Sequence, residues 1–301
     1  MLSAAEIKQA ARQAGFDRCG IAAAGPLNDF ASQLGDWLSL GMNADMAFMA
    51  QHVEKRANPA KLVPGARSVV SVLLGCRPAQ TMKGTVRIAQ YAYGADYHRE
   101  VKSRLFVMLE RLKTLNPELQ GRPFVDTAPI SDKLWAWRCG LGWIGRNTLL
   151  VSPDWGTFCS LGELVIDQEA DVYDTPLPNR CGDCQRCVAA CPNGALAQEG
   201  RPCLDARRCA SYHTIENRAE SLPQGIALSG YAFGCDVCQL ACPYNAEALR
   251  RETADLERMT QLEQLAQCDE AQFKSFTRHS AMDRISFVQW RRNVEACMQQ
   301  Q

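Results

Sequence analysis

Hydrophobic and polar residues recur along the first half of the chain with periods that predict both helices and strands. Helical periodicity extends over residues 3–15, 29–40 and 97–115. The β-branched run SVVSVLL at residues 68–74 is typical of a buried strand. Further strands are expected at residues 85–93, 124–125, 147–151 and 161–166. Strands that alternate with helices in this way predict an α/β or α+β domain.

The chain is expected to have three regions. The α/β (α+β) domain covers residues 1–170. The acidic, proline-bearing stretch 167–179 is interpreted as a linker to the next region. A cysteine-rich domain follows over residues 171–250. After Pro243 the sequence is polar with helical character, so residues 251–301 are expected to form a short helical segment.

The overall charge gives no support for broad nucleic-acid binding. Lysine plus arginine total 33, aspartate plus glutamate total 33, and the sequence pI is about 6.9. A nucleic-acid partner would therefore need a local basic patch. The candidates are Arg278, His279, Arg284, Arg291 and Arg292, and a solvated helix face explains these residues equally well.

The sequence predicts neither export nor membrane insertion. No segment offers the ~18 uninterrupted apolar residues that a membrane-spanning helix needs. The N-terminal helix carries charges throughout, lacks the apolar core of a signal peptide, and has no twin-arginine signal. We therefore expect a cytoplasmic protein with no membrane contact, in a compartment where thiols stay reduced.

Eight of the fifteen cysteines are spaced as ligands of two [4Fe–4S] clusters. The sequence reads Cys181-x2-Cys184-x2-Cys187-x3-Cys191-Pro192, then Cys209, then Cys235-x2-Cys238-x3-Cys242-Pro243. In two-cluster ferredoxins the cysteine before the proline binds the other cluster. This rule assigns Cys181, Cys184, Cys187 and Cys242 to cluster one, and Cys191, Cys209, Cys235 and Cys238 to cluster two. Structural zinc is the alternative, but zinc sites use separated pairs of cysteines rather than three in one run.

The second cysteine run contains a long insertion. Twenty-five residues separate Cys209 from Cys235, where a simple ferredoxin keeps two. We expect this insertion to contact a substrate or a second cofactor beside cluster two. The other cysteines have scattered spacing and are interpreted as small buried apolar residues: Cys19, Cys76, Cys139, Cys159, Cys203, Cys268 and Cys297.

Gly140-Leu-Gly142-Trp-Ile-Gly145 matches the dinucleotide-binding pattern G-x-G-x-x-G, with Glu163 as an acidic residue further along. That pattern is meaningful only between a strand and a following helix. Here the preceding residues look helical and the following ones look like a strand. The glycines are therefore interpreted as a tight helix-to-strand turn.

Asp126, in Val-Asp-Thr-Ala-Pro, has two interpretations. Aspartate is a favoured helix N-cap, and a proline close to the first turn fits that role. The alternative is a general acid at the mouth of a pocket. His98 and Asp132 are equally ambiguous between structural and functional roles.

The chain resembles the epoxyqueuosine reductases of tRNA queuosine synthesis. Matching stretches run in the family's order over residues 52–56, 62–69, 91–98, 125–129, 140–147, 162–164, both cysteine runs, 208–212 and 291–293. Several independent motifs make this resemblance more specific than the cysteines alone.

The resemblance implies an N-terminal domain that binds cobalamin close to a ferredoxin-like domain with two [4Fe–4S] clusters. It implies Asp126 as the proton donor rather than a helix cap. The implied cobalamin contacts are Arg56, Ala92, Asp126, Leu150, Leu161 and Ser211, together with Asp236 at the end of the insertion.

The implied reaction reduces the epoxide of epoxyqueuosine, at the wobble position of tRNA, to the alkene of queuosine. It consumes two electrons and two protons and releases water, with Asp126 protonating the leaving oxygen. The implied partners are the tRNA anticodon stem-loop and an electron donor such as flavodoxin or ferredoxin. A monomer is expected.

The resemblance has one departure and leaves two alternatives. Longer members continue with C-terminal helical repeats that help to hold tRNA, whereas this chain stops nine residues after Arg292, as in shorter members. One alternative is a corrinoid iron–sulfur reductase of a small molecule, similar to reductive dehalogenases, although that group is largely exported. The other is a non-catalytic electron carrier, which would not need the large N-terminal domain.

Overall fold

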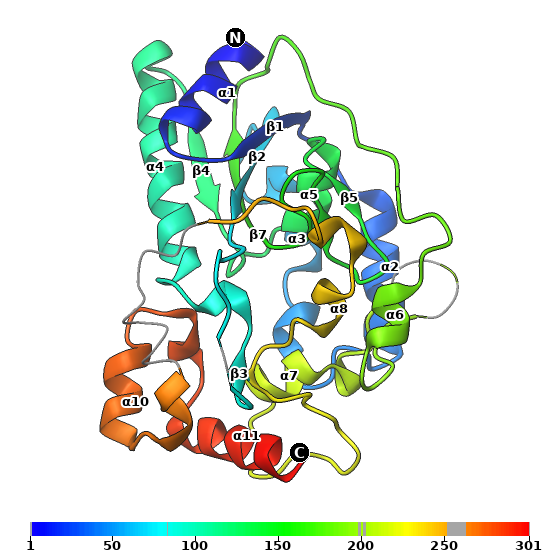
Figure 1. Ribbon diagram of the computed structural model, residues 1–301. Coiled ribbons are helices and arrows are strands. Elements are labelled where there is room, and N and C mark those ends of the chain that lie inside the picture. The colour runs from blue at the N-terminus through cyan, green and yellow to red at the C-terminus, as the bar shows by residue number, and fades with distance from the viewer. Residues whose placement is uncertain (1, 83, 198–199, 201–202, 252–262, 301) are drawn as a thin grey trace.

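The structure is a computed structural model that describes residues 2–82, 84–197, 200, 203–251 and 263–300 (Figure 1). Its main sheet has four strands in the order β1-β2-β7-β4, and every neighbouring pair is antiparallel. The strands are β1 Arg18–Ala23, β2 Ser68–Gly75, β4 Gly121–Phe124 and β7 Cys159–Ile166. Because the pairing is antiparallel, the first domain is of the α+β type rather than a parallel α/β sheet.

Strand β2 lies in the middle of the core and is buried at every position. Side chains on a strand alternate between its two faces. Val70 and Val72 pack toward helices α1 (Ala4–Gln13) and α4 (Tyr97–Leu115), which cover one face. Val69 and Leu73 pack on the other face with α5 (Asp132–Arg138). This two-sided burial explains the uninterrupted apolar run in the sequence, and the predicted helix at 97–115 is confirmed.

Smaller elements surround this core. They are the helices α2 Asn28–Ser39 and α3 Val53–Ala57, the 3₁₀ turns η1 Ala47–Ala50 and η2 Pro59–Lys61, and the hairpin strands β5 Trp143–Ile144 and β6 Leu150–Val151. Gly140 has φ +72° and separates α5 from β5. The order is helix, turn and strand, which confirms the interpretation of the glycine motif as a turn rather than a dinucleotide site.

Two predicted strands are shorter in the structure than in the sequence pattern. In residues 85–93 only β3 (Arg87–Ile88) is a strand, and the chain continues into the 3₁₀ turn η3 (Gln90–Ala92). The backbone N–H of Gln90 donates to the Asp236 carboxylate at 2.8 Å, so it is unavailable to a neighbouring strand. In residues 147–151, Thr148 has φ +63° and delays the start of β6.

The cysteine-rich region contains short helices and turns. They are α6 Arg186–Ala190, η4 Ala206–Arg208, α7 Ala210–Ile215, β8 Tyr231–Phe233, α8 Val237–Leu240 and η5 Pro243–Asn245. Strand β8, from the Cys209–Cys235 insertion, pairs in parallel with β3 from the first domain. The linker 167–179 has no helix or strand, and Asp174 ties it to β1 by accepting from the Ile21 N–H at 2.9 Å.

The C-terminal segment packs back onto the insertion (Figure 1). Its elements are η6 Leu265–Gln267, α10 Glu270–Thr277, η7 Ala281–Arg284 and α11 Phe287–Gln299, while residues 252–262 of the predicted helical segment lie outside the described residues. Trp290 of α11 and Phe233 of β8 share one fully buried core. Across the described residues, no helix has both the length and the apolar character needed to cross a membrane.

Candidate active site between the sheet domain and the cysteine-rich region

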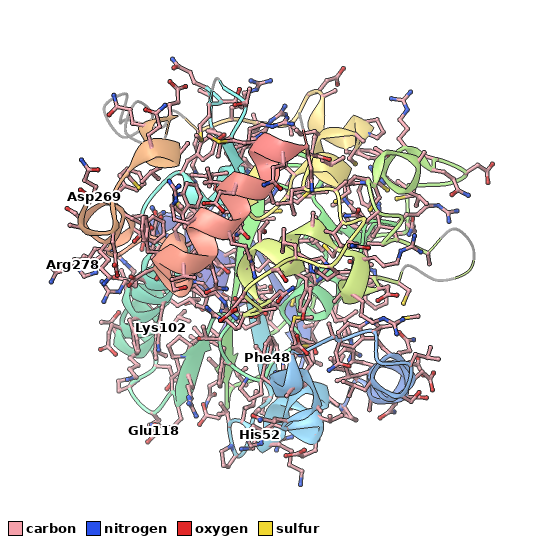
Figure 2. All side chains as sticks on the ribbon, turned by 90° about the horizontal axis from the view of Figure 1, so that it is seen from below. Phe48, His52, Lys102, Glu118, Asp269 and Arg278 are labelled. Carbon is pink, nitrogen blue, oxygen red and sulfur yellow. The ribbon has the colours of Figure 1, made fainter. Side chains whose placement is uncertain are left out.

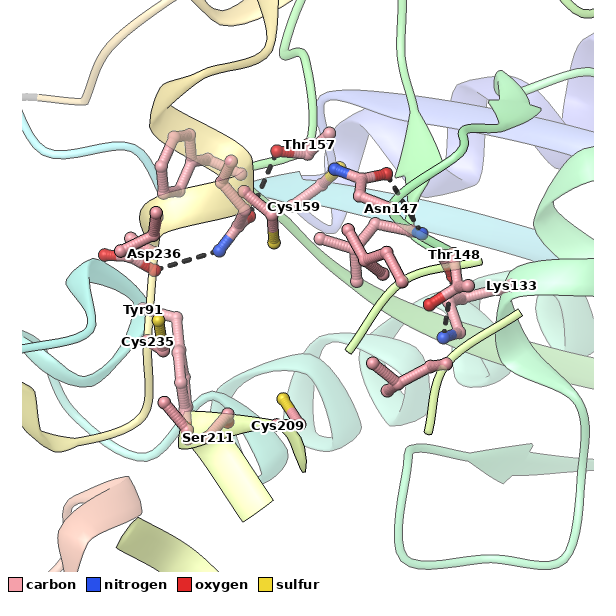
Figure 3. A pocket seen from close by; sticks show the side chains of 18 of the residues that line it. Tyr91, Lys133, Asn147, Thr148, Thr157, Cys159, Cys209, Ser211, Cys235 and Asp236 are labelled. Atoms are coloured by element: carbon pink, nitrogen blue, oxygen red, sulfur yellow. Dashed lines mark hydrogen bonds between the residues drawn. The ribbon is translucent and has the colours of Figure 1, made fainter. Parts of the chain in front are cut away.

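A cavity of about 410 Å³ lies where the start of β7 meets the cysteine-rich region (Figure 3). Leu161 of β7, Ser211 of α7 and Asp236 beside α8 contribute to its wall. Six cysteines also line it: Cys76 and Cys159 from the sheet region, and a group of four, Cys191, Cys209, Cys235 and Cys238, from the cysteine-rich region. The group of four is the set that the sequence assigns to cluster two, so the structure brings that set together on one side of the cavity.

The other four predicted ligands surround a separate, small cavity of about 20 Å³. Its cysteines are Cys181, Cys184, Cys187 and Cys242. Cys203, which the sequence rule leaves out of both sets, lines neither cavity, and its Sγ lies 3.7 Å from the Sδ of Met42. The eight cysteines are thus divided in space as the sequence rule divides them.

Two unpaired donors at the small cavity fit an iron–sulfur cluster there. Asn147 and Arg146 both line this cavity, and the buried Asn147 Nδ2 and Arg146 Nε have no hydrogen-bond partner within the described chain. A buried donor without an acceptor costs about 1–3 kcal/mol. Cluster sulfurs accept such hydrogen bonds, and these bonds help to set the reduction potential.

Asp126 is held in an unusual backbone conformation by contacts with helix α4. Its φ of +29° is in the left-handed region, which non-glycine residues rarely adopt. Its Oδ2 accepts a hydrogen bond from the Tyr97 hydroxyl at 3.1 Å and lies 2.9 Å from His98 Nε2. The N-cap of α5 is Ser131, so the cap interpretation of Asp126 is wrong.

Asp126 and His98 form a hydrogen-bonded pair in which each side chain favours the charged form of the other. Partial burial raises the pKa of Asp126, but the hydrogen bonds from His98 and Tyr97 outweigh it and lower the pKa below the ordinary value. For His98, burial disfavours the imidazolium, whereas the hydrogen bonds to Asp126 and Asp96 raise its pKa overall. In the protein without substrate, Asp126 is therefore a carboxylate at neutral pH.

A second cavity of about 650 Å³ adjoins the first. Asp126, Asp132 and Lys133 line both cavities, so these three residues mark the boundary between them. The second cavity is also lined by Phe48 and His52, which lie near each other on the surface shown in Figure 2.

The predicted cobalamin contacts fall into three groups. Asp126, Leu161, Ser211 and Asp236 line the first cavity. Arg56 lines the second cavity, where its guanidinium donates to the backbone carbonyls of Phe48 and Gln51. Ala92 and Leu150 are buried in the protein core and line neither cavity.

Several residues of the site carried no signal of their own in the sequence. Tyr91 and Tyr97 line the first cavity, and their rings meet edge to face at 5.8 Å. Lys133 also lines the cavity and donates to the Thr148 carbonyl at 2.9 Å (Figure 3). Tyr91 and Tyr97 belong to the stretch 91–98 that carries the family resemblance, which is the one signal that points to them.

The C-terminal basic residues do not form one free patch. Arg292 donates to the backbone carbonyls of Asn217 at 3.1 Å and His213 at 2.8 Å, so it is a structural residue. Arg284 pairs with Glu216 at 2.7 Å. Arg278 lies well apart from Phe48 and His52 (Figure 2), away from the mouth of the second cavity.

Comparison with known proteins agrees with this geometry. Residues 56–127 match the family described as "Epoxyqueuosine reductase QueG, DUF1730", and residues 180–245 match the "4Fe-4S double cluster binding domain". The epoxyqueuosine reductase of Gloeobacter violaceus is 38% identical in an alignment of 310 positions, which covers 98% of this chain and 96% of that protein. The epoxyqueuosine reductase of Synechocystis sp. is 42% identical, and the alignment covers 90% of this chain and 96% of that protein.

A crystal structure of an epoxyqueuosine reductase with a tRNA-Tyr epoxyqueuosine-modified stem-loop superimposes with a TM-score of 0.87. The two chains are 25% identical, and the superposition covers 98% of this chain and 80% of the chain in that crystal structure. A double-cluster domain that borders a cavity with an acidic residue defines an iron–sulfur oxidoreductase. More particularly, the chain belongs to the epoxyqueuosine reductase family.

Proposed function

We propose that this protein reduces epoxyqueuosine to queuosine at the wobble position of tRNA. The observation that carries the proposal is the position of Asp126, at the boundary between a cavity bordered by the cluster-two cysteines and a second, outer cavity. Family membership over nearly the whole chain supports the same substrate. It also disfavours a small-molecule dehalogenase or a simple electron carrier.

The clusters would be held by the two cysteine sets, and cobalamin would occupy the first cavity. Leu161, Ser211 and Asp236 would contact cobalamin there, and Ser211 is two residues from the cluster-two ligand Cys209. Bound there, cobalamin would supply one-electron reduction chemistry for opening the epoxide, with the clusters as the source of electrons.

Asp126 would donate a proton to the epoxide oxygen as its C–O bond breaks. An alkoxide is a poor leaving group, and a positioned acid contributes about 10²–10⁴ in rate. The Tyr97 hydroxyl and the His98 ring fix the Asp126 carboxyl from the same helix, α4. His98 is also positioned to return a proton to Asp126. Burial disfavours the charged His98 ring, but its hydrogen bonds to Asp126 and Asp96 raise its pKa overall.

The second cavity would receive the modified nucleoside. Enzymes that act on a base take it out of the stack and hold it against aromatic side chains. Phe48, whose side chain is substantially exposed, and His52 offer such surfaces at the cavity wall. The electron donor, such as a flavodoxin or ferredoxin, would approach cluster one, because Cys181 and Cys184 also line an outer surface groove with Arg180.

The test uses protein reconstituted anaerobically with iron, sulfide and cobalamin, a chemical reductant and an epoxyqueuosine-containing anticodon stem-loop. We expect conversion to queuosine, measured by nucleoside mass spectrometry. Asp126→Asn should lower the rate about 10²–10⁴-fold with iron and corrin content unchanged. The matched control is Asp29→Asn, an exposed aspartate in α2, which should retain the wild-type rate. An Asp126→Asn protein with full activity would return Asp126 to a structural role.

A further inference from the structure

Two carboxyl groups lie together beneath Asp126, and the reaction as described so far uses neither of them. Glu163 of β7 is fully buried and stands directly opposite Ser71 of β2 in the sheet register. The Ser71 hydroxyl donates to Glu163 Oε1 at 3.1 Å. Asp132, the first residue of α5, lies over the same face and interacts directly with the Glu163 carboxyl.

Neither carboxyl is neutralised by a cation in direct contact. Glu163 Oε2 and Asp132 Oδ1 are buried, and neither has a donor within the described chain. The nearest cations are already engaged, because Lys133 donates to the Thr148 carbonyl and Arg56 to those of Phe48 and Gln51. Two adjacent carboxylates in a buried site repel each other and are poorly solvated. A single shared proton satisfies both otherwise unpaired oxygens.

The surrounding groups favour the protonated pair. Glu163 is faced by Ser71 from β2, by Phe124 from β4 and by the uncharged Cys139 directly after α5, so it meets no opposite charge. Burial and the neighbouring Asp126 raise the pKa of Asp132 to about 6 despite Lys133, and burial with the Asp132 charge raises that of Glu163 well above its usual range. The pair titrates as one unit.

The proposed reaction needs a source for its second proton. An epoxide, two electrons and two protons give an alkene and water, so both C–O bonds break and the oxygen receives two protons. Asp126 holds at most one proton at a time and is a carboxylate in the substrate-free protein. Asp132 lines the same two cavities as Asp126, so a proton on the pair has a short route to it.

We propose that Asp132 and Glu163 share a stored proton and return it to Asp126 for the second C–O cleavage. In the first cleavage Asp126 gives the epoxide oxygen a proton that it receives from His98. Asp126 then takes the stored proton and passes it to the departing hydroxide as the second C–O bond breaks, and the two electrons come through the clusters from the external donor. The inference rests on the proposed function for its substrate. The stored proton itself is a property of the chain.

The experiment uses the reconstituted holoprotein and two independent readouts. Infrared spectra at pH 7 should contain a protonated-carboxyl band that shifts in D₂O and is lost in both Glu163→Gln and Asp132→Asn. Single-turnover reduction of the stem-loop should slow about 10²-fold in both variants, with a larger loss at higher pH. Ser71→Ala is the matched control: it removes a hydrogen bond to Glu163 but no proton, so it should keep the band and a rate within about threefold of wild type.

The two readouts separate this inference from the proposed function. If wild-type holoprotein does not reduce the stem-loop, the proposed function fails, while the infrared band still reports on the shared proton. Absence of the band from wild type would overturn the inference. Wild-type rates in Glu163→Gln and Asp132→Asn would also overturn it, and so would equal losses in Ser71→Ala and Glu163→Gln.

Discussion

At the scale of single residues, the site is organised by strain and by shared protons. Asp126 keeps a left-handed φ of +29°, and its carboxylate is fixed by two residues of α4. Non-glycine residues in that region cost on the order of 1–3 kcal/mol and persist where the surroundings enforce them. The hydrogen bonds from Tyr97 and His98 supply that enforcement.

The His98 pair makes stability depend on pH. Burial opposes the charge on His98, but Asp126 and Asp96 raise its pKa above the ordinary value of about 6.5. Because the folded pKa is raised, the stabilisation is fully present below pH 6.5 and is lost as the pH rises through the folded pKa. His98→Gln should therefore lower the free energy of unfolding more at pH 6 than at pH 9, as measured by denaturant titration. An equal loss at both pH values would contradict the charged pair.

The acidic pair Asp132–Glu163 also makes stability fall as the pH rises, because its folded pKa values are raised as well. Burial raises the pKa of Asp132 to about 6, above the unfolded value of about 3.9. The wild-type protein should therefore lose stability as the pH rises from about 4 through 6, because ionisation is resisted only in the folded state. Glu163→Gln should flatten this dependence, measured as the midpoint of thermal unfolding between pH 4 and pH 8. A wild-type midpoint that does not change over this interval would contradict the raised pKa.

The sequence identified some of these residues but not the contacts between their side chains. Asp126 was visible as a candidate acid, and the cysteine spacing predicted two ligand sets that the structure separates in the same way. The contacts of Asp126 with Tyr97 and His98 span 29 and 28 residues, and no local pattern encodes them. Glu163 stood out in a misleading dinucleotide motif and in one stretch of the family resemblance, and neither signal pointed to its contact with Asp132 on another element.

At the scale of elements, local periodicity predicted what is locally determined. The helix at 97–115 and the buried strand at 68–74 agree with α4 and β2. The strand expected at 85–93 was mostly wrong, because the Gln90 N–H binds the distant Asp236 carboxylate instead of a strand. The Cys209–Cys235 insertion reaches the first cavity through Ser211. It also contributes buried apolar side chains against which α11 packs.

Helix α11 is joined to the insertion by buried polar contacts. The amide of Asn293 is fully buried and donates to the backbone carbonyls of Thr214 and Ala232, each at 2.9 Å. Asn293→Leu should destabilise the protein by about 1–3 kcal/mol, because two buried carbonyls lose their donor. Arg291→Ala is the control on the same helix, since its exposed pair with Glu295 contributes only about 0.3–0.5 kcal/mol. Equal stability of the two variants in denaturant titration would show that α11 is not anchored in this way.

At the scale of the whole molecule, the sheet, the cysteine-rich region and the C-terminal segment all contribute residues to the two adjoining cavities. The cysteines assigned to cluster two border the first cavity, whereas Cys181 and Cys184, assigned to cluster one, line an outer groove. Electrons would therefore enter at cluster one and leave from cluster two. Asn147 lines both the cluster-one cavity and the first cavity, which makes it a shared wall between them.

The two ligand sets can be separated by single substitutions. Cys184→Ser should remove cluster one and Cys238→Ser cluster two, each reducing the iron content from about eight to about four atoms per chain. Because the cysteines assigned to cluster two border the first cavity, Cys238→Ser should also weaken corrin retention, whereas Cys184→Ser should not. Iron analysis and gel filtration with bound corrin provide the measurements. Corrin loss in Cys184→Ser alone would reverse the assignment of the two cavities.

The most direct test of the central proposal is tRNA nucleoside analysis in a bacterial strain that lacks its own epoxyqueuosine reductase. Expression of this protein should restore queuosine and remove accumulated epoxyqueuosine, while the Asp126→Asn protein should leave epoxyqueuosine in place. Persistence of epoxyqueuosine in cells whose wild-type protein contains both clusters and a bound corrin would contradict the proposed function.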